Sequence, residues 1–398
     1  MIMSFMKGLH RFLFCLLIGI VLSACGGGGD GDSVGQGTLS TSLTDTSTDE
    51  YQAIYVTIDG VEVHKSGNGN GQWETVATPE KTYNLLELVN GVRETLGVAN
   101  LDAGHYTQMR LIIGKNPDQG LNILSTQHPF ANYFIDQNNE VKELKIPSGM
   151  NTGVKVVNGF NINENQTTEL LLDFNAMHSV VKAGSSGKYL LKPTVKVVDT
   201  ADYAIVSGVV AEDGTDPQVL LEGTLVTAQL PVTSGDPKDQ VVIDAGTLSD
   251  ENGAYSLFLA PNEPGDSYNL VASLSGYHPV CSTLTLGADS VTEVNFDLPV
   301  VTTSLGTVLG EVRINNTAVD QFATIEFRQE VSCPTASEIE TVTVRSFNIA
   351  DGGNYSIELP EGSYQLVAWS YGMLTVAYDI SVTAGGDTTQ HITLDPAP

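Results

Sequence analysis

The stretch Ala53-Ile54-Tyr55-Val56-Thr57-Ile58-Asp59-Gly60-Val61-Glu62-Val63-His64 is rich in β-branched and aromatic residues and is broken once, by Asp59-Gly60. Such side chains favour strands, whereas Asp and Gly favour turns, so the stretch predicts two joined β-strands. Similar runs recur between clusters of Gly, Asn and Asp, at residues 38–44, 107–113, 143–146, 153–157, 168–174 and 189–198. One short helix is expected, over residues 83–89. The pattern indicates sandwiches of packed sheets.

Length and composition agree with this fold class. The 398 residues suggest two or three domains, and 40 Gly suit a turn-rich β protein. We therefore expect an all-β chain with three consecutive β-sandwich domains after an N-terminal signal and tether. The 18 basic and 47 acidic residues give a net charge of −29, which repels phosphate backbones and argues against nucleic acid as a partner. The acidic excess is interpreted as a solvated surface, with no cofactor or metal site predicted.

An internal repeat organises the second half of the chain. Residues 253–257 (GAYSL) recur as 353–357 (GNYSI), and residues 268–272 (YNLVA) recur as 364–368 (YQLVA). Each copy opens with a strand-like run that contains one Gly, Gly208 or Gly310. The copies, at 204–299 and 305–396, resemble carboxypeptidase regulatory-like domains, the second one more distantly. The resemblance implies transthyretin-like (prealbumin-like) sandwiches, which are grouped with carbohydrate-binding folds, and a glycan hypothesis follows only from that association.

The segment between the N-terminus and the repeat has a pattern of its own. It carries VTIDGVEV at 56–63, then Trp73, LLEL at 85–88, LDAGHYTQMRL at 101–111, LDF at 172–174 and LLKPT at 190–194. Together these motifs resemble the bacterial lipoprotein domain-of-unknown-function family 4382 over residues 38–199. That family implies no established activity, so the resemblance suggests a compartment rather than a mechanism.

The N-terminus has the features of an export signal. Basic residues from Lys7 to Arg11 precede an apolar run at 12–22, which is too short to span a membrane. The run ends in Leu22-Ser23-Ala24-Cys25, which resembles the lipobox of bacterial lipoproteins. The resemblance implies removal of the signal peptide 1–24 and acylation of Cys25, with palmitate among the attached chains. Several acyl chains together give stable membrane anchoring.

Residues 25–37 are predicted to be the lipidated Cys and a Gly-rich tether. Gly26 stands where, in Gram-negative lipoproteins, an Asp suggests inner-membrane retention, so the resemblance favours the outer membrane. Whether the body faces the periplasm or the cell surface is left open. The expected partner is the membrane through the lipid, with a glycan or another envelope protein as further candidates.

Four cysteines allow few pairings. Cys15 lies in the apolar run and Cys25 ends it, so only Cys281 and Cys333 remain for the folded body. No pair has the spacing of a metal site. In an oxidising compartment Cys281 and Cys333 could form a disulfide, although spacing alone cannot show whether they are within reach.

No pattern in the chain supports catalysis, and no catalytic residue is predicted. Gly31-Asp32-Ser33-Val34-Gly35 matches a hydrolase nucleophile motif, but it falls in the tether with no strand before it. The acidic stretches at 250–253 and 351–354 are interpreted as turns rather than calcium loops. The remaining enzyme hypothesis is a hydrolase or metal site in the first domain, built from His64, His105 and His178 if the fold brings them together.

Aromatic residues concentrate in the repeats. Tyr255 and Tyr268, with their repeat partners, are predicted to be core residues, because they alternate inward along strands. Trp369 and Tyr371, near the expected end of a strand, are the best candidates for exposed ligand stacking. The leading prediction is a lipid-anchored envelope protein with a non-enzymatic binding or structural role, and carbohydrate binding is the main alternative.

Overall fold

The computed structural model describes residues 35–65, 73–147, 153–156, 159–183, 188–200, 203–262, 266–315, 321–334 and 339–398. Almost all regular structure in these ranges is strand, so the all-β prediction is confirmed. Cys25 and most of the predicted tether lie outside the described residues. Among the described residues, no helix is long and apolar enough to cross a membrane.

Two sheets enclose the first apolar core, which lies between Leu39 and Val197. Their elements are β1 (Gln36–Thr46), β2 (Ala53–Lys65), β3 (Trp73–Ala77), β4 (Lys81–Asn84), η1 (Leu85–Glu87), β5 (Glu94–Asp102), β6 (Gly104–Ile113), β7 (Asn132–Ile135), β8 (Val141–Lys145), β9 (Val154–Val156), β10 (Phe160–Ile162), β11 (Thr167–Asn175), α1 (Ala176–Ser179), β12 (Val180–Ala183), β13 (Lys188–Leu191) and β14 (Val195–Asp199). One sheet has the order β14-β11-β1-β5, with β1 and β11 parallel.

Three local predictions for this segment are wrong. The run expected over 189–198 is divided into β13 and β14, which belong to different sheets. The stretch 53–64 forms one strand rather than two, because β2 continues through Asp59-Gly60 with only a register shift against β6. The helix expected over 83–89 is a single 3-10 turn, since Tyr83 pairs with Val56 as part of β4. Sheet pairing there overrides the local helical preference.

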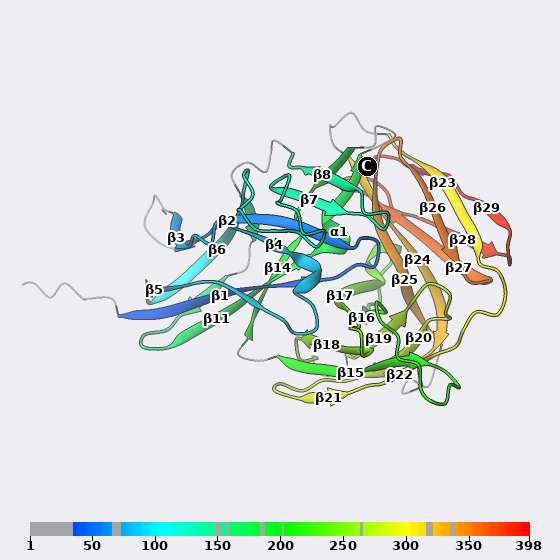
Figure 1. The fold of residues 1–398 in the computed structure, drawn as a ribbon, viewed down its shortest axis with the longest axis horizontal. Helices are drawn as coiled ribbons and strands as arrows, with labels where there is room; N and C mark the ends of the chain where they lie inside the picture. The colour runs from blue at the N-terminus through cyan, green and yellow to red at the C-terminus, as the bar shows by residue number, and fades with distance from the viewer. Residues whose placement is uncertain are drawn as a thin grey trace, which may run out of the picture. The chain divides into compact units, whose positions relative to one another are not determined.

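The two repeat copies form the second and third apolar cores. The second contains β15 (Ala204–Glu212), β16 (Leu225–Pro231), η5 (Pro237–Asp239), β17 (Val241–Leu248), β18 (Ala254–Leu259), β19 (Tyr268–Ser273), β20 (Val280–Leu284), β21 (Val291–Glu293) and β22 (Phe296–Leu298). The third contains β23 (Gly306–Ile314), β24 (Phe322–Ser332), β25 (Ile339–Ala350), β26 (Asn354–Leu359), β27 (Gly362–Trp369), β28 (Val376–Val382), β29 (Asp387–Thr389) and β30 (Ile392–Leu394). They are green to yellow and yellow to red in Figure 1.

The copies share one strand pairing. In the second core β15 pairs with β18, β21 and β22, and in the third β23 pairs with β26, β29 and β30. In both copies the last partner strand is interrupted opposite the glycine, at Val294 or Gln390. A Cβ built on Gly208 would lie 1.7 Å from the carbonyl oxygen of Val294, and one on Gly310 would lie 1.9 Å from that of Gln390. Glycine is therefore required by close backbone approach.

The repeated tyrosines stabilise the same interruption. Tyr255 donates a hydrogen bond to the Val294 carbonyl at 2.6 Å, and Tyr355 donates one to the Gln390 carbonyl at 2.5 Å. Both side chains are buried, as predicted. The sequence repeat thus corresponds to one local structure that occurs twice. In each copy, a glycine leaves room for the backbone carbonyl of the interrupted strand, and a tyrosine hydroxyl donates a hydrogen bond to that carbonyl.

One sheet connects the first core with the third. Its order runs from β10 through β6, β2, β7, β8, β13 and β12 to β25, β24, β27 and β28. The connection is a parallel pairing of β12 with β25 at Lys182 and Ile349. Residues 35–398 accordingly group as one compact unit.

Candidate functional site

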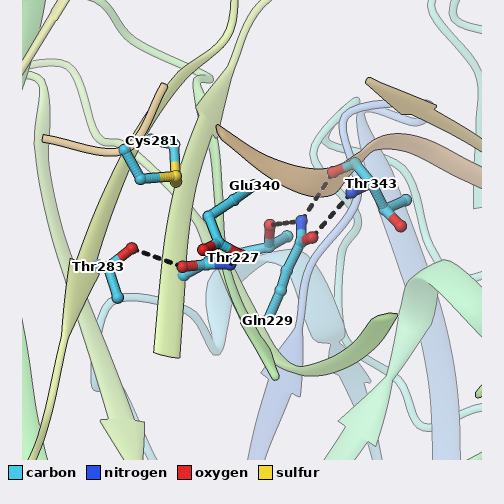
Figure 2. Close-up of a disulfide and its surroundings, with 8 residues drawn as sticks. Thr227, Gln229, Cys281, Thr283, Glu340 and Thr343 are labelled. Carbon is cyan, nitrogen blue, oxygen red and sulfur yellow. Dashed lines mark hydrogen bonds between the residues drawn. A yellow bond between two sulfur atoms is a disulfide. The ribbon is translucent and has the colours of Figure 1, made fainter. Parts of the chain in front are cut away.

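Cys281 and Cys333 form a disulfide that joins the two repeat copies within the third core, with their Cα atoms 4.8 Å apart (Figure 2). Cys281 lies on β20 and Cys333 directly follows β24, and both side chains are buried. Beside the bridge, Asn269 accepts a hydrogen bond from Thr283 at 2.6 Å and donates one to Glu340 at 3.3 Å. The cross-link closes a sequence separation of 52 residues, which corresponds to roughly 4 kcal/mol in the chain-entropy model.

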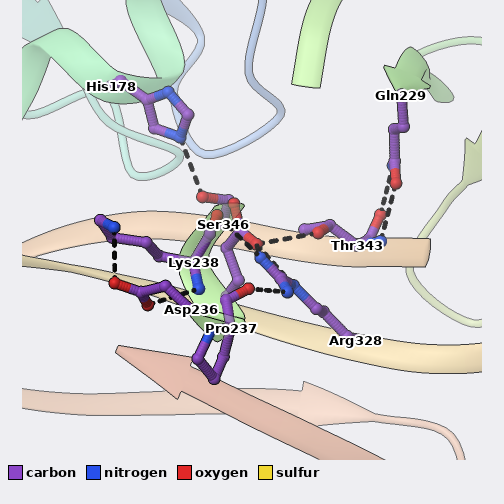
Figure 3. A network of polar contacts seen from close by, with 9 residues as sticks. His178, Gln229, Asp236, Pro237, Lys238, Arg328, Thr343 and Ser346 are labelled. Carbon is purple, nitrogen blue, oxygen red and sulfur yellow. Dashed lines mark hydrogen bonds and ion pairs between the residues drawn. The ribbon is translucent and has the colours of Figure 1, made fainter. Parts of the chain in front are cut away.

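A buried ion pair lies on the face of β24 that meets the second core (Figure 3). Arg328 has no solvent-exposed surface and Glu326 is 3% exposed. The Arg328 Nε and Nη2 atoms donate to Glu326 Oε2 at 2.8 and 2.6 Å. Arg328 Nη1 also donates to the Pro237 carbonyl at 2.6 Å, and thereby binds the η5 turn. Burial raises the pKa of Glu326, whereas the Arg328 charge lowers it. The arginine thus joins two cores through one guanidinium group.

Gln229 adds a second polar bond across the same boundary. Its side-chain amide donates to the Thr343 carbonyl at 2.7 Å and accepts from the Thr343 amide at 2.8 Å. The Thr343 hydroxyl in turn donates to Glu326 at 3.0 Å. The Gln229 side chain thus uses both its amide nitrogen as a donor and its amide oxygen as an acceptor. This buried side chain forms the same pair of hydrogen bonds with β25 that the backbone of a neighbouring strand would form.

The first core reaches the same place through His178. His178, a residue of α1, shares a hydrogen bond of 3.0 Å between its Nε2 and the Ser346 hydroxyl of β25. Burial lowers the pKa of His178 to about 4, so the ring is neutral at pH 7. We call the set His178, Gln229, Glu326, Arg328, Thr343 and Ser346 the junction network. It ties together side chains from all three cores.

The histidines of the enzyme hypothesis have separate partners. His64 contacts the Thr107 hydroxyl at 3.2 Å and His105 contacts the Asn161 side chain at 2.9 Å, whereas His178 belongs to the junction network. In the ranges that the structure covers, no three His, Cys, Asp or Glu side chains come together in a way that could hold a metal ion. Apart from Gly35, the nucleophile-like motif at 31–35 lies outside those ranges.

The acidic stretches of the repeats form hydrogen-bonded turns. Asp250 Oδ1 accepts from the backbone amides of Asn252 and Ala254, at 2.8 and 2.9 Å. Asp351 Oδ1 accepts from the amide of Ile314 at 2.7 Å. The Asp250 carboxylate thus stabilises its own turn, whereas the Asp351 carboxylate fastens its turn to the end of β23.

Trp369 and Tyr371 differ in exposure. Trp369 ends β27 and is half-buried, whereas Tyr371 is 94% exposed. The turn that carries Tyr371 is held by Ser370, whose hydroxyl donates to the Phe322 carbonyl at 2.6 Å, and by a bond from the Met373 amide to the Ser370 carbonyl. The exposed aromatic face of this pair therefore belongs to Tyr371.

A polar hollow of about 680 Å³ lies beside the junction network. Arg328 contributes to its wall, and polar side chains of β27 and β28 line it: Ser363, Gln365, Asp379 and Ser381. Amide, carboxylate and hydroxyl groups in one hollow can hydrogen-bond a polyhydroxylated ligand. Sequence reasoning did not find this hollow, because alternating polar residues on a strand also indicate an ordinary solvated face.

Residues 36–193 match the model of a family described as "Domain of unknown function (DUF4382)". Hyalin of Strongylocentrotus purpuratus is 26% identical over 148 residues, which cover 35% of this chain and 12% of hyalin. The chain thus spans about an eighth of that protein.

Several solved structures share a low similarity with this chain. The Bacillus anthracis TIE protein aligns over 91% of this chain and 51% of its own, with 12% identity and a TM-score of 0.19. The shaft pilin SpaA of Lactobacillus rhamnosus GG aligns over 50% of this chain and 98% of its own, with 13% identity and a TM-score of 0.19. A streptococcal ancillary pilin aligns over 91% and 99%, with 13% identity and a TM-score of 0.18. These similarities are too low to support any argument about function.

Proposed function

We propose that this protein is a lipid-anchored cell-envelope protein with a structural, non-enzymatic role. The observation that carries the proposal is the connection of all three cores by the junction network, with the disulfide joining the two repeat copies. Bonds between cores at several points restrain domain movement, as a rigid support requires. A disulfide also suits an oxidising compartment outside the cytoplasm. The Leu22-Ser23-Ala24-Cys25 motif supplies the expected lipid attachment.

Anchoring is tested by labelling cells with a palmitate analogue and comparing the wild type with Cys25→Ser. We expect label and membrane association in the wild type and loss of both in the variant. Protease treatment of intact cells then distinguishes the two sides of the outer membrane. Digestion indicates the cell surface, and protection until the membrane is broken indicates the periplasm. Equal labelling of Cys25→Ser would contradict the anchoring.

Rigidity is tested by spin labels on cysteines introduced at Val98 and Val291. These are exposed positions on β5, beside the first core, and on β21, beside the second. We expect one narrow distance distribution between the labels. The same pair in Thr247→Ala is the matched comparison, since that change removes the hydrogen bonds to Asn90 between the first and second cores without touching either labelled strand. A broad distribution in the otherwise unchanged protein would contradict a rigid body.

Carbohydrate binding is the second candidate function, and the polar hollow favours it. We expect Gln365→Ala and Asp379→Ala to weaken retention on immobilised glycans, and Tyr371→Ala to do so if its exposed ring stacks on the sugar. Thr389→Ala is the control, because this exposed residue of β29 lies in the other sheet and does not line the hollow. Retention that none of these changes affects would rule this candidate out.

A further inference from the structure

In the connection between β6 and β7, several large apolar side chains are exposed while two polar side chains are buried, the reverse of the usual arrangement. The exposed apolar residues are Leu121 (63%), Ile123 (42%), Leu124 (37%) and Phe130 (38%). The polar residues Asn122 and His128 of the same loop are buried, at 5% and 9% exposure. Exposed apolar side chains that form one patch can mark a surface that contacts a protein or a membrane. We call Leu121, Ile123, Leu124 and Phe130 the apolar loop.

The buried polar residues hold the loop in one conformation. Asn122 Oδ1 accepts hydrogen bonds from the backbone amides of Leu124 and Thr126, at 3.0 and 3.2 Å, and closes the turn at the tip. The Ile123 amide donates to the Tyr55 hydroxyl at 2.8 Å, which fastens the tip to β2. The apolar side chains are thus presented by a preformed turn, and binding need not order it.

The base of the loop is fixed through His128. Its Nδ1 lies 2.8 Å from the Tyr133 hydroxyl, and its Nε2 lies 3.6 Å from Asp118 Oδ1. Asp118 in turn accepts from the amides of Thr82 and Gly120, at 2.9 and 2.7 Å. Burial lowers the pKa of His128, although the charge of Asp118 acts in the opposite direction, so burial favours the neutral ring.

The chemistry of the loop limits what can cover it. Residues 119–135 contain no Asp, Glu, Lys or Arg, in a chain whose net charge is −29. A partner that binds through charged groups would therefore have no ion-pair partner on this loop. Four apolar side chains exposed by about half present on the order of 300 Å², whereas a stable protein interface needs about 800 Å² from each partner. By itself the apolar loop supplies less than half of the area that a stable dimer of this chain would bury on each partner.

We propose that the apolar loop inserts into the interfacial region of a neutral lipid bilayer and acts as a second membrane contact. The proposal rests on the lipid anchoring proposed above, because a few apolar side chains bind a membrane weakly alone but add to an anchor that already holds the protein there. A bilayer needs no complementary shape, and an uncharged tip meets no electrostatic penalty at a zwitterionic surface.

The test uses the full-length protein purified from membranes and reconstituted on phosphatidylcholine vesicles. An environment-sensitive fluorophore is placed at Leu124→Cys, and at the exposed Val291→Cys as the control. Flotation of the wild type and Cys25→Ser with the vesicles reports on the anchor. A lipid-borne quencher reports on the loop. We expect strong quenching and a blue shift at position 124 only, with quenching reduced roughly twofold by Ile123→Ser and unchanged by Val98→Ser.

The outcomes separate the two proposals. Failure of the wild type to float contradicts the anchor, and the loop proposal falls with it. Flotation with equal quenching at positions 124 and 291 overturns the loop proposal and leaves the anchor standing. A concentration-dependent shift at position 124 without vesicles, accompanied by dimer formation in sedimentation, also overturns it and identifies a second copy of the chain as the occupant.

Discussion

Arg328 and Glu326 lie two residues apart on β24 and form an ion pair with almost no solvent exposure at the boundary between two cores. Neighbouring residues of the same strand face point toward the same side, so one strand delivers both charges to the boundary. The pair satisfies its own charges, and the remaining donors of Arg328 bind the η5 backbone.

The first prediction concerns this pair. Arg328→Ala leaves the Glu326 carboxylate buried without its cation, which should lower the free energy of unfolding by about 3–5 kcal/mol. Arg313→Ala is the control, since Arg313 forms an exposed ion pair with Glu311 and should cost less than about 1 kcal/mol. Urea denaturation followed by circular dichroism measures both. A double change, Arg328→Met with Glu326→Leu, should recover most of the loss.

The second prediction concerns the interrupted strand of the repeats. Gly208→Ala places a Cβ against the Val294 carbonyl and should destabilise the protein by several kcal/mol, or prevent its folding. The thermal midpoint and the yield of folded protein measure the effect. Gly287→Ala, where a Cβ would meet nothing within 4 Å, should stay close to the wild type. Similar losses in both variants would show that the close approach is not the cause.

The third prediction concerns Asp173, which lies at the boundary between the first two cores. Burial raises its pKa to about 6, as does the nearby Asp244, whereas hydrogen bonds from Thr46 and the charge of Lys196 lower it. The folded protein therefore binds this proton more tightly than the unfolded chain. Its stabilising contribution is fully present below about pH 4 and is lost as the pH rises through about 6, on the order of 3 kcal/mol.

Asp173→Asn should remove that dependence, so its stability relative to the wild type should increase between pH 4 and 7. Asp213→Asn, at an exposed position, is the control. His178 changes in the opposite direction, because a lowered histidine pKa costs stability as the pH falls from about 6.5 to about 4. Subtracting the wild-type curve cancels that contribution. A difference that is flat with pH would mean that the carboxyl of Asp173 titrates normally.

The fourth prediction concerns the disulfide. Replacing Cys281 and Cys333 together by Ala should lower the free energy of unfolding by roughly 4 kcal/mol. Reduction of the wild type should have a similar effect, and reduction of the double variant should have none. Thermal unfolding with and without a reducing agent measures this. An unchanged midpoint on reduction would show that the bridge adds nothing to stability.

Local sequence patterns were sufficient for most of the strands and for the repeat. Tyr255 and Tyr355 are buried where the pattern placed them, because strand alternation and core burial are local properties that a sequence records. The helix predicted over 83–89 failed because Tyr83 gains more from pairing with β2 than from its helical neighbours.

The candidate site depends on pairings that no local pattern encodes. Glu326 and Arg328 alternate with the core residues Ile325 and Phe327, which is also the pattern of a strand with one solvated face. They are buried because η5 and other parts of the second repeat copy pack against that face. A weak signal was present in the uncharged polar residues of β25, such as Thr343, whose face also proves to be covered.

The pairing of β12 with β25 also affects how the chain acquires its structure. A chain is synthesised from its N-terminus, so the edge of β12 near Lys182 is complete long before Ile349 exists. Until then this edge displays unsatisfied amide and carbonyl groups to any extended segment nearby. During synthesis, self-association through this edge therefore competes with correct folding. The competition ends when β25 of the last sandwich pairs with β12 and covers the edge.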